Sequence, residues 1–411
     1  MKKLLVVWII ILLVGMSVPS TGINVEKSTA SNYGNTLYVG GSGPGNYTKI
    51  QDAINDSSDG DAVFVYNGTY YEQDIIVDKS IKLVSASRNN TIIHGQGNYK
   101  CVVYLIGGDI VFINFTVTSS KPGTRGIVVD SDNNQIKYCN IVNNRCGGII
   151  FYDSGVENTC ISNCYFYNPG DSGIHIYVGD YGLVWNTSIS YCEFIEDKVY
   201  LSGAPNSIIS DCVLYGRNAY ILISRMSDDS HISNCTLDSV TPVAIWNECD
   251  RLKIINCTLT NCEEGIRIAY GPKKTHISNC SIINSYDNYG ILFFGDSKKT
   301  IITGCNISNN SIGLGFFSGV YSTRIMNCNF AFNQRGVDFY SFNCFNRFYR
   351  NNFINNEKHI NTFPPGGNVL YMVDYFNENY WSDWRGHGPY HVCRLLNWDW
   401  NPVSKPYDIG V

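Results

Sequence analysis

Charge and helical periodicity are both scarce in this sequence. Only 16% of the 411 residues are charged, and the formal net charge is −5. Such a chain has no general attraction for nucleic acid or for an acidic membrane surface, so we expect neither as a partner. No repeat shows the apolar spacing of a helix, and the 5 Met and 7 His form no cluster in the sequence. Because Cu(I) sites use clustered Met, Cys and His, copper handling finds little support here.

Long hydrophobic runs are also missing after the N-terminus. The run LLVVWIIILLVGM at residues 4–16 follows Lys2 and Lys3 and precedes the small residues SVPSTG. Its length is short for a membrane span and typical of a secretory signal. We therefore expect a signal peptide at residues 1–22, a secreted or cell-surface protein, and no membrane span after its removal. An uncleaved N-terminal anchor is the alternative.

Cysteine, in contrast, is abundant and regularly spaced. The phrase HISNC stands at residues 231–235 and 276–280, with KIINC at 253–257 between them. Successive repeats are 20 to 28 residues long when they are aligned on the last position of this phrase. Periods of this size indicate a solenoid. That position is held by Asn114, Cys139, Cys164, Cys192, Cys212, Cys235, Cys257, Cys280, Cys305, Cys328 and Asn351.

Each repeat also carries a second strand-like phrase about fourteen residues before the cysteine. Examples are GIHI at 173–176, GIRI at 265–268 and GVDF at 336–339. Alternation with a period of two predicts strands, and the linking Asn, Gly, Ser and Asp predict turns. A leucine-rich repeat has a similar period, but it needs Leu at fixed places where Ile, Val and Phe dominate here. We therefore predict an all-β parallel β-helix of about eleven coils over residues 101–360.

Stacking of the coils would bring the cysteines into one column. Equivalent residues of successive coils lie about 4.8 Å apart, and buried Cys behaves as a small apolar residue. We interpret the column as a ladder of free thiols. Disulfides between neighbouring coils fit the distance but need specific side-chain dihedrals, and intervals of 20 to 28 residues supply no finger-like metal spacing.

The two ends of the sequence differ from the repeats, as the caps of a solenoid should. In TKIQDAIND, Thr48 and Gln51 resemble a capping box, and Ile50, Ala53 and Ile54 share one helical face. We predict a short capping helix and the first incomplete coils within residues 23–100. After residue 360 the pattern breaks at NTFPPGG, and four of the seven Trp follow. Residues 361–411 are therefore predicted to form an irregular aromatic C-terminal cap.

These segments together resemble a known group. The stretch from YTKIQDAIND to IKLVSA, the TIIHG that follows, the NCxI…GI coils and the closing NYWSDW…GPY are similar to NosD-like proteins. Those are secreted right-handed parallel β-helix proteins of the pectin-lyase-like superfamily, named for a periplasmic copper-protein maturation factor. The resemblance covers nearly the whole chain after residue 22. It implies the right-handed fold, but the fold hosts lyases, hydrolases, esterases and binding proteins.

The catalytic motifs of the best-marked enzymes of this superfamily are missing. The QDTLY and DFIFG phrases of pectin methylesterases do not occur, nor do the NTD and RIK of polygalacturonases. The paired Asp228 and Asp229 and the GHG at 386–388 lie far apart in the sequence. No catalytic residue can be carried over, and whether the protein is an enzyme stays open. Copper-site maturation rests on the family resemblance alone.

One outward column of the second strand is rich in aromatic side chains, and basic residues gather in the turn that follows. Aromatic faces on a flat sheet suit sugar rings, and Lys suits carboxylates. Cross-strand packing and an ordinary solvated surface are the alternatives. The candidate binding residues are Tyr177, Tyr200, Trp246, Phe294, Phe317, Tyr340, Lys273, Lys274, Lys298 and Lys299.

Several acids fall on the same edge, and they determine what an enzyme could do. A lyase would need a base and a charge partner there, and Ca²⁺, which takes several oxygen ligands, is the cofactor such a lyase would hold. We expect no other cofactor or metal. The leading interpretation is a monomeric protein that binds a polysaccharide or cell-envelope glycan, which the lysines predict to be anionic. A polysaccharide lyase or glycosidase acting on an acidic glycan is the alternative, and copper-site maturation is a further one. The acids are Asp228, Asp229, Glu248, Asp250 and Asp296.

Overall fold

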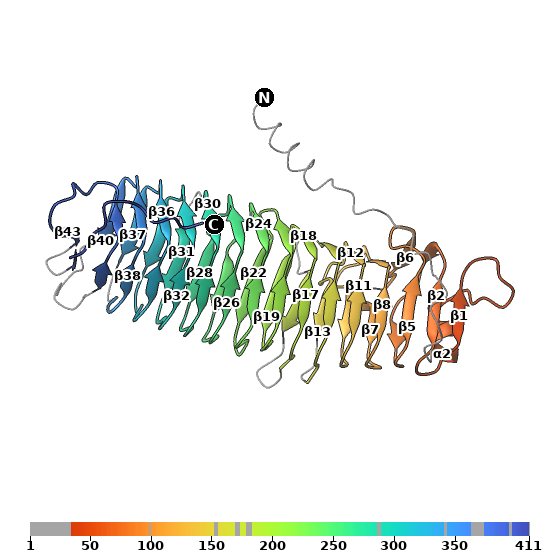
Figure 1. Ribbon diagram of the computed structural model, residues 1–411. Helices are drawn as coiled ribbons and strands as arrows, with labels where there is room; N and C mark the ends of the chain where they lie inside the picture. The colour runs from red at the N-terminus through yellow and green to blue at the C-terminus, as the bar shows by residue number, and fades with distance from the viewer. Residues whose placement is uncertain are drawn as a thin grey trace, which may run out of the picture. The chain divides into compact units, whose positions relative to one another are not determined.

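The computed structural model describes residues 34–410, apart from 98–99, 152–154, 169–172, 178–182, 286–288, 341–342, 363–373 and 394–396. The expected signal segment at residues 1–22 lies outside the described residues. In the described part, short strands are joined by turns and follow one another as coils, in chain order, from β1 to β43 (Figure 1). The predicted parallel β-helix is confirmed.

Three strands recur in each coil, and each pairs in parallel with its equivalent in the next coil. Ile232, for example, pairs with Ile254, which pairs with Ile277. The described strands form three sheets of 17, 14 and 13 strands, here called sheets A, B and C. The 14 strands of sheet B correspond to about fourteen coils, more than the eleven expected. The difference arises because the coils begin before residue 101, with regular pairing already present at Ala62.

Sheet A contains β1 (Thr36–Val39), β2 (Ala62–Val65), β5 (Lys82–Ser85), β8 (Val111–Ile113), β11 (Gln135–Lys137), β14 (Cys160–Ser162), β17 (Ser188–Ser190), β20 (Ile208–Ser210), β23 (His231–Ser233), β26 (Lys253–Ile255), β29 (His276–Ser278), β32 (Ile301–Thr303), β35 (Arg324–Met326), β38 (Arg347–Tyr349), β41 (Tyr375–Asn377), β43 (Tyr390–Cys393) and β44 (Asn397–Asp399).

Sheet B contains β3 (Gly68–Tyr70), β6 (Thr91–His94), β9 (Thr116–Thr118), β12 (Asn140–Val142), β15 (Tyr165–Tyr167), β18 (Glu193–Ile195), β21 (Val213–Tyr215), β24 (Thr236–Asp238), β27 (Thr258–Thr260), β30 (Ser281–Ile283), β33 (Asn306–Ser308), β36 (Asn329–Ala331), β39 (Asn352–Ile354) and β42 (Tyr380–Trp381).

Sheet C contains β4 (Ile75–Val77), β7 (Cys101–Leu105), β10 (Arg125–Val129), β13 (Ile149–Phe151), β16 (Ile174–Tyr177), β19 (Lys198–Ser202), β22 (Tyr220–Ser224), β25 (Val243–Trp246), β28 (Ile266–Ala269), β31 (Tyr289–Phe294), β34 (Ile312–Phe316), β37 (Arg335–Phe339) and β40 (Lys358–Thr362).

The core is built from a few inward positions of each coil. In one coil, Ile232, Cys235 and Leu237 are each at most 1% exposed, because alternate strand residues point to opposite faces. Each ladder thiol lies near the backbone, as Cys235 Sγ does at 3.3 Å from the carbonyl oxygen of Ser233. Within the described residues all ladder cysteines are free. The thiols therefore complete the core as small apolar side chains.

The ladder begins one residue later than the sequence alignment placed it. Asn114 has φ 69° and is only half-buried, whereas Phe115 is fully buried and accepts the amide hydrogen bond of Asn140. Asn114 therefore corresponds to the turn residue that precedes each cysteine, such as Asn163 with φ 56°. The assignment of Asn114 was wrong because Asn occupies both kinds of position; Asn351, which is fully buried, was assigned correctly.

Buried asparagines form a second ladder at the turns after sheet B. Asn333 is 1% exposed. Its Oδ1 accepts from the backbone N–H of Asn310 at 2.9 Å and from Asn310 Nδ2 at 3.1 Å. Its Nδ2 donates to Asn356 Oδ1 at 3.0 Å. The amides thus satisfy backbone groups that the turn removes from the sheets.

The first coil is closed by α2 (Ile50–Asp56), which buries Ile50, Ala53 and Ile54 as predicted. The predicted capping box is wrong, because the residue before the helix is Lys49 and it makes no side-chain cap. Instead Glu72 accepts from the backbone N–H groups of Ile50 and Gln51 at 2.7 and 3.1 Å. A carboxylate from the connection between β3 and β4 therefore satisfies the helix N-terminus. α2 is the one helix in the described part of the chain, and it is too short to span a membrane.

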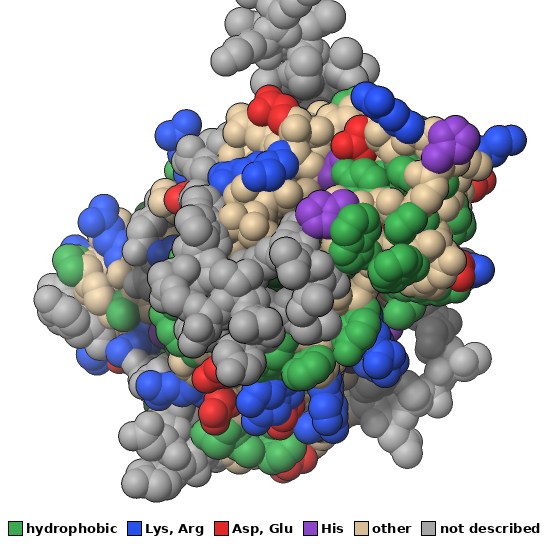
Figure 2. All heavy atoms as spheres, turned by 90° about the vertical axis from the view of Figure 1, so that its left-hand side faces the viewer, with side chains coloured by type: hydrophobic (Ala, Val, Ile, Leu, Met, Phe, Trp, Pro, Cys, Tyr) green, Lys and Arg blue, Asp and Glu red, His purple; other side chains and the backbone are tan. Residues whose placement is uncertain are grey.

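The last coil is closed by an aromatic stack. Trp381 is 1% exposed and lies between Phe353 and Tyr390, with 4.3 Å between ring centroids on each side. Hydrophobic and His side chains gather on this end of the solenoid (Figure 2). The β43–β44 pair is antiparallel, so the regular coil pattern ends here. This arrangement matches the aromatic C-terminal cap expected from the sequence.

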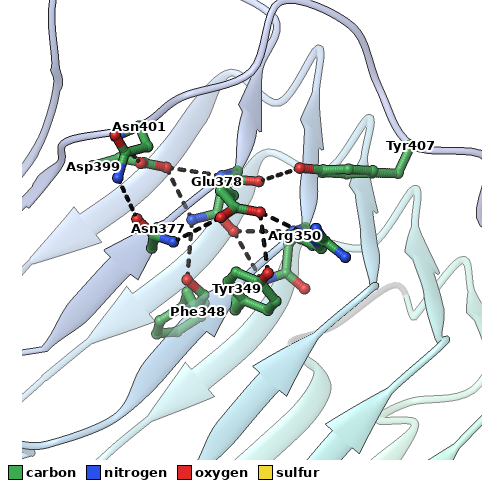
Figure 3. A network of polar contacts seen from close by, with 10 residues as sticks. Phe348, Tyr349, Arg350, Asn377, Glu378, Asp399, Asn401 and Tyr407 are labelled. Atoms are coloured by element: carbon green, nitrogen blue, oxygen red, sulfur yellow. Dashed lines mark hydrogen bonds and ion pairs between the residues drawn. The ribbon is translucent and has the colours of Figure 1, made fainter.

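The final residues turn back over earlier coils. Tyr407 exchanges two hydrogen bonds with the side chain of Asn352, at 2.8 and 2.9 Å, and its hydroxyl donates to the carbonyl of Glu378 at 2.9 Å. Glu378 also pairs with Arg350 at 3.0 Å (Figure 3). The tail is therefore fixed against the sides of β39 and β42 by polar contacts.

Candidate functional site

The outward aromatic column lies at the end of sheet C, where each coil turns toward sheet A. Trp246, Ala269 and Phe294 are register partners on β25, β28 and β31. Phe317 and Tyr340 follow in the same register. The N–H of Phe317 donates to the carbonyl oxygen of Phe293, and the N–H of Tyr340 donates to the carbonyl oxygen of Phe316. Stacking of the coils thus aligns residues that are more than twenty positions apart in the sequence.

A continuous row of five aromatic rings results, which we call the aromatic track: Trp246, Tyr270, Phe294, Phe317 and Tyr340. Successive ring centroids are 6.2, 5.7, 5.5 and 4.4 Å apart. Tyr270 is 53% exposed and Phe294 is 40% exposed. Trp246, Phe317 and Tyr340 are half-buried, so the row presents an apolar surface that is most open at Tyr270 and Phe294.

Tyr270 was missed in the sequence because Ala269 occupies the aromatic column in its coil. Tyr270 has φ 62°, a left-handed conformation that is rare for a bulky residue. This backbone turn places its ring between Trp246 and Phe294 and so fills the gap left by Ala269. The phrase AYG contains the one usable signal, a tyrosine directly before the turn glycine.

Two other candidate aromatic residues lie in earlier coils of the same sheet, and the sequence places Tyr200 in the outward column two residues before that of the track. Tyr200 pairs with His175, with ring centroids 4.9 Å apart, and lies in a column two residues earlier. Tyr177 does pair with Ser202 in the column of the track, but its side chain lies outside the described residues. Ser202 and Ser224, which follow in that column, are at most 3% exposed. The track therefore begins at Trp246 and does not include Tyr200.

The four expected lysines lie together in the turns after the track. Lys273 and Lys298 form a parallel bridge, and the N–H of Lys274 donates to the carbonyl of Lys298 at 2.9 Å. All four side chains are exposed, and Lys298 Nζ lies 5.8 Å from the ring centroid of Tyr321. The structure thus brings Lys273, Lys274, Lys298 and Lys299 into a two-by-two array in adjacent coils.

A groove of about 810 Å³ opens beside the first rings of the track. It lies over the turns between sheets C and A, and Tyr270 lines both the groove and the track. Three of the expected acids line it, together with two arginines and two aromatic rings. Its lining residues are Leu183, Trp185, Ser202, Gly203, Pro205, Asn206, Arg225, Met226, Asp228, Asp229, Asn247, Glu248, Arg251 and Tyr270.

Arg251 determines the electrostatics of the groove floor. It binds Asp229 through two hydrogen bonds of 2.8 and 2.7 Å and reaches Asp228 at 3.2 Å. The hydrogen bond from Arg251 lowers the pKa of Asp229. Asp229 therefore stays ionised and is unsuited to act as a general acid. Asp228 also accepts from the N–H of Asp250 at 2.8 Å, and Asp250 accepts from the N–H of Lys273 at 3.0 Å.

Solved structures with the same fold confirm the architecture. The chain is similar to the A-module of the mannuronan C-5 epimerase AlgE6 from Azotobacter vinelandii, at 13% identity and a TM-score of 0.51, over 80% of this chain and 93% of that one. It is also similar to tailspike protein 3 of bacteriophage CBA120, at 10% identity and a TM-score of 0.50, over 84% of this chain and 61% of that one. None of the curated proteins compared matches the sequence.

Two family models match the sequence. Residues 185–386 match the family described as periplasmic copper-binding protein (NosD), and residues 125–241 match the right-handed β-helix region. The described residues do not fit a copper site. No group of three or more His, Cys, Asp or Glu among them could hold a metal ion. His231 and His276 share a column, but Lys253 lies between them.

Family matches and fold agree over most of the repeats. The two matches together extend from residue 125 to residue 386, and parallel coils are present in the described residues of that range, with sheet C ending at Thr362. The chain is therefore a right-handed parallel β-helix protein, and its residues 185–386 match the NosD family.

Proposed function

We propose that the protein binds an anionic polysaccharide along the aromatic track, outside the cytoplasm. The observation that carries the proposal is the track itself, five rings in successive coils with two of them at least 40% exposed. Coils about 4.8 Å apart give a surface about 19 Å long. Rings of this kind offer flat apolar faces to sugar rings and order at low entropic cost.

The lysine array supports an acidic ligand. Lys273, Lys274, Lys298 and Lys299 are exposed in the turns of the same coils. Each exposed ion pair adds about 0–1 kcal/mol, so charge selects the polymer through several contacts together and salt weakens it. The sequence of residues 1–22 and the periplasmic description of the matched family support an extracytoplasmic location.

A binding experiment with defined variants tests the proposal. Tyr270→Asn keeps a residue that tolerates positive φ, and together with Phe294→Ala it removes the two most exposed rings. The double variant should bind polygalacturonate about tenfold more weakly by calorimetry, at about 0.5–1.5 kcal/mol per ring. The control, Tyr138→Asn with Tyr215→Ala, removes two exposed rings elsewhere, since Tyr138 is 48% and Tyr215 is 49% exposed and Tyr138 has φ 55°. Equal binding by the track variant and the control would reject the track.

Reversal of the four lysines to Glu tests the ligand's charge separately. The variant should lose its preference for polygalacturonate over neutral dextran, because the array then repels carboxylates. Unchanged preference would remove the anionic part of the proposal and leave the track in place.

A polysaccharide lyase or glycosidase is the second candidate, and the groove favours it. Asp228, Asp229 and Glu248 line it next to Tyr270, so a polymer on the track would pass these carboxylates. Incubation with uronate polymers should then release unsaturated sugars or new reducing ends. Glu248→Gln should abolish that release while binding persists. If the parent protein releases no product, the enzyme candidate is rejected and the binding proposal stands.

A further inference from the structure

A second groove, of about 410 Å³, lies on the outer face of sheet A. It crosses β35, β38 and β41 near the C-terminal end and shares no lining residue with the groove beside the track. We call it the arginine groove, lined by Arg324, Met326, Arg347, Phe348, Tyr349, Tyr375 and Asn377.

Two arginines face each other directly in this groove. Arg324 and Arg347 are register partners on β35 and β38, and both are exposed. Like charges placed directly opposite each other across neighbouring strands destabilise a sheet. Glu378, which accepts a hydrogen bond from Tyr349 of the groove wall, pairs with Arg350. Neither Arg324 nor Arg347 makes an ion pair with any residue in the described ranges.

The walls of the groove are aromatic and held in place. The guanidinium carbon of Arg347 lies 5.7 Å from the ring centroid of Tyr375. The hydroxyl of Tyr349 donates to Glu378 at 3.1 Å, and Asn401 Nδ2 donates to Asn377 Oδ1 at 2.8 Å (Figure 3). These contacts fix the side of the groove nearest the C-terminal tail, and a preformed site loses less entropy on binding.

We propose that the arginine groove binds an acidic sugar unit, whose oxyanion lies between Arg324 and Arg347 and whose ring packs against Tyr375. An oxyanion relieves the repulsion between the two guanidinium groups and accepts their paired N–H donors, for which Arg is well shaped. The apolar face of the sugar covers the tyrosine ring. A carboxylate and a sulfate ester both supply this chemistry. The proposal does not require the aromatic track to bind glycan.

Calorimetry with short ligands tests the site on the full chain. A di-uronide and a sulfated disaccharide should both bind, and the matching neutral disaccharide should not. Arg324→Gln and Arg347→Gln should each weaken binding about tenfold, the effect of one charged hydrogen bond, and the double variant should abolish it. Arg217→Gln, at an exposed arginine of another coil, should bind like the parent protein.

Two further variants test the sugar packing and the independence of this groove from the aromatic track. Tyr375→Leu should weaken the sugar acids at least threefold and leave inorganic sulfate unchanged; equal effects on both would overturn the sugar packing. The track variant with Tyr270→Asn and Phe294→Ala should bind the short acids normally, so failure of the track and failure of this groove are distinguishable. Absence of binding to every anion, or unchanged binding by the double arginine variant, would overturn the site.

Discussion

The hydroxyl of Tyr289 lies 3.0 Å from the hydroxyl of Tyr340, although the two residues are 51 positions apart. Tyr340 donates in turn to Asp338 Oδ2 at 3.1 Å, and Asp338 pairs with Arg335 at 2.9 Å. Burial raises the pKa of both Tyr289 and Asp338. This chain of polar groups holds the ring of Tyr340 4.4 Å from that of Phe317, and so it orients the last ring of the aromatic track.

Removal of one hydroxyl should therefore affect both stability and the track. Tyr289→Phe should lower the free energy of unfolding by about 0.5–1.5 kcal/mol, the net value of a hydrogen bond. It should also weaken polygalacturonate binding two- to threefold, because Tyr340 loses its support. Denaturant unfolding and calorimetry measure the two effects. Tyr138→Phe, at an exposed ring, is the control and should change neither.

The ladder thiols should be hidden from a thiol reagent in the native protein. Nine cysteines from Cys139 to Cys328 are at most 2% exposed, and only the thiolate reacts. Burial raises the pKa of Cys249 and Cys262 to about 12, so these two should be equally slow. In denaturant without reductant, all of these thiols should react with the reagent. Release of only a few thiols would show that the ladder is disulfide-bonded.

The asparagine ladder should contribute more to stability than any exposed asparagine. Asn333→Ala leaves the buried N–H groups of Asn310 without their acceptor. An unsatisfied buried group costs about 1–3 kcal/mol, and the change should appear as a lower midpoint of denaturant unfolding. Asn218→Ala, at an exposed position, is the matched control. Equal midpoints would mean that water replaces the amide.

Stability should fall in mildly acidic solution because of His359. Its ring is buried beside Asn356 and Ser382, and burial lowers its pKa below the ordinary value of 6.5, although Asp383 opposes this. The unfolded chain then binds the proton more readily than the folded chain, so the stabilisation is full above pH 6.5 and is lost as the pH falls below it. Melting temperatures at pH 7.5 and 5.5 measure the loss.

A variant tests whether the loss of stability at low pH comes from the His359 ring. His359→Gln should flatten the difference between the two melting temperatures, whereas His387→Gln, at an exposed site, should retain it. A parent protein that melts at the same temperature at both pH values contradicts the assignment.

The periodic part of the fold could be predicted from the sequence because successive coils place similar residues at equivalent inward positions. The inward position of Cys235 is a cysteine in nine successive coils, from Cys139 to Cys328, and the pattern is visible in any two neighbouring repeats of that range. The helix cap could not be predicted, since Glu72 reaches α2 from the later connection between β3 and β4. Asn114 was misplaced because one residue type serves two adjacent positions.

For the candidate site, the sequence predicted which residues occupy equivalent positions in successive coils, but not the full set of side chains that come together. Trp246, Phe294, Phe317 and Tyr340 share a column because strand pairing preserves it, and the sequence shows that column. Tyr270 depends on a left-handed backbone at one turn, which local composition does not specify. The arginine groove is formed by side chains of β35, β38 and β41 on one face, together with contacts from the tail. Because the turns differ in length, the sequence does not show which of these side chains lie next to one another.

The uniform register makes the solenoid a molecular ruler. Because His231, Lys253 and His276 occupy equivalent places, residues 253–275 are one complete unit, and each unit contacts mainly its neighbours. Excision of those residues would join equivalent points of two coils and keep every remaining column aligned. The shortened chain would carry a row of rings one step shorter, lacking Tyr270. The length of the aromatic row therefore changes in steps of one coil and is set by how many coils carry a ring.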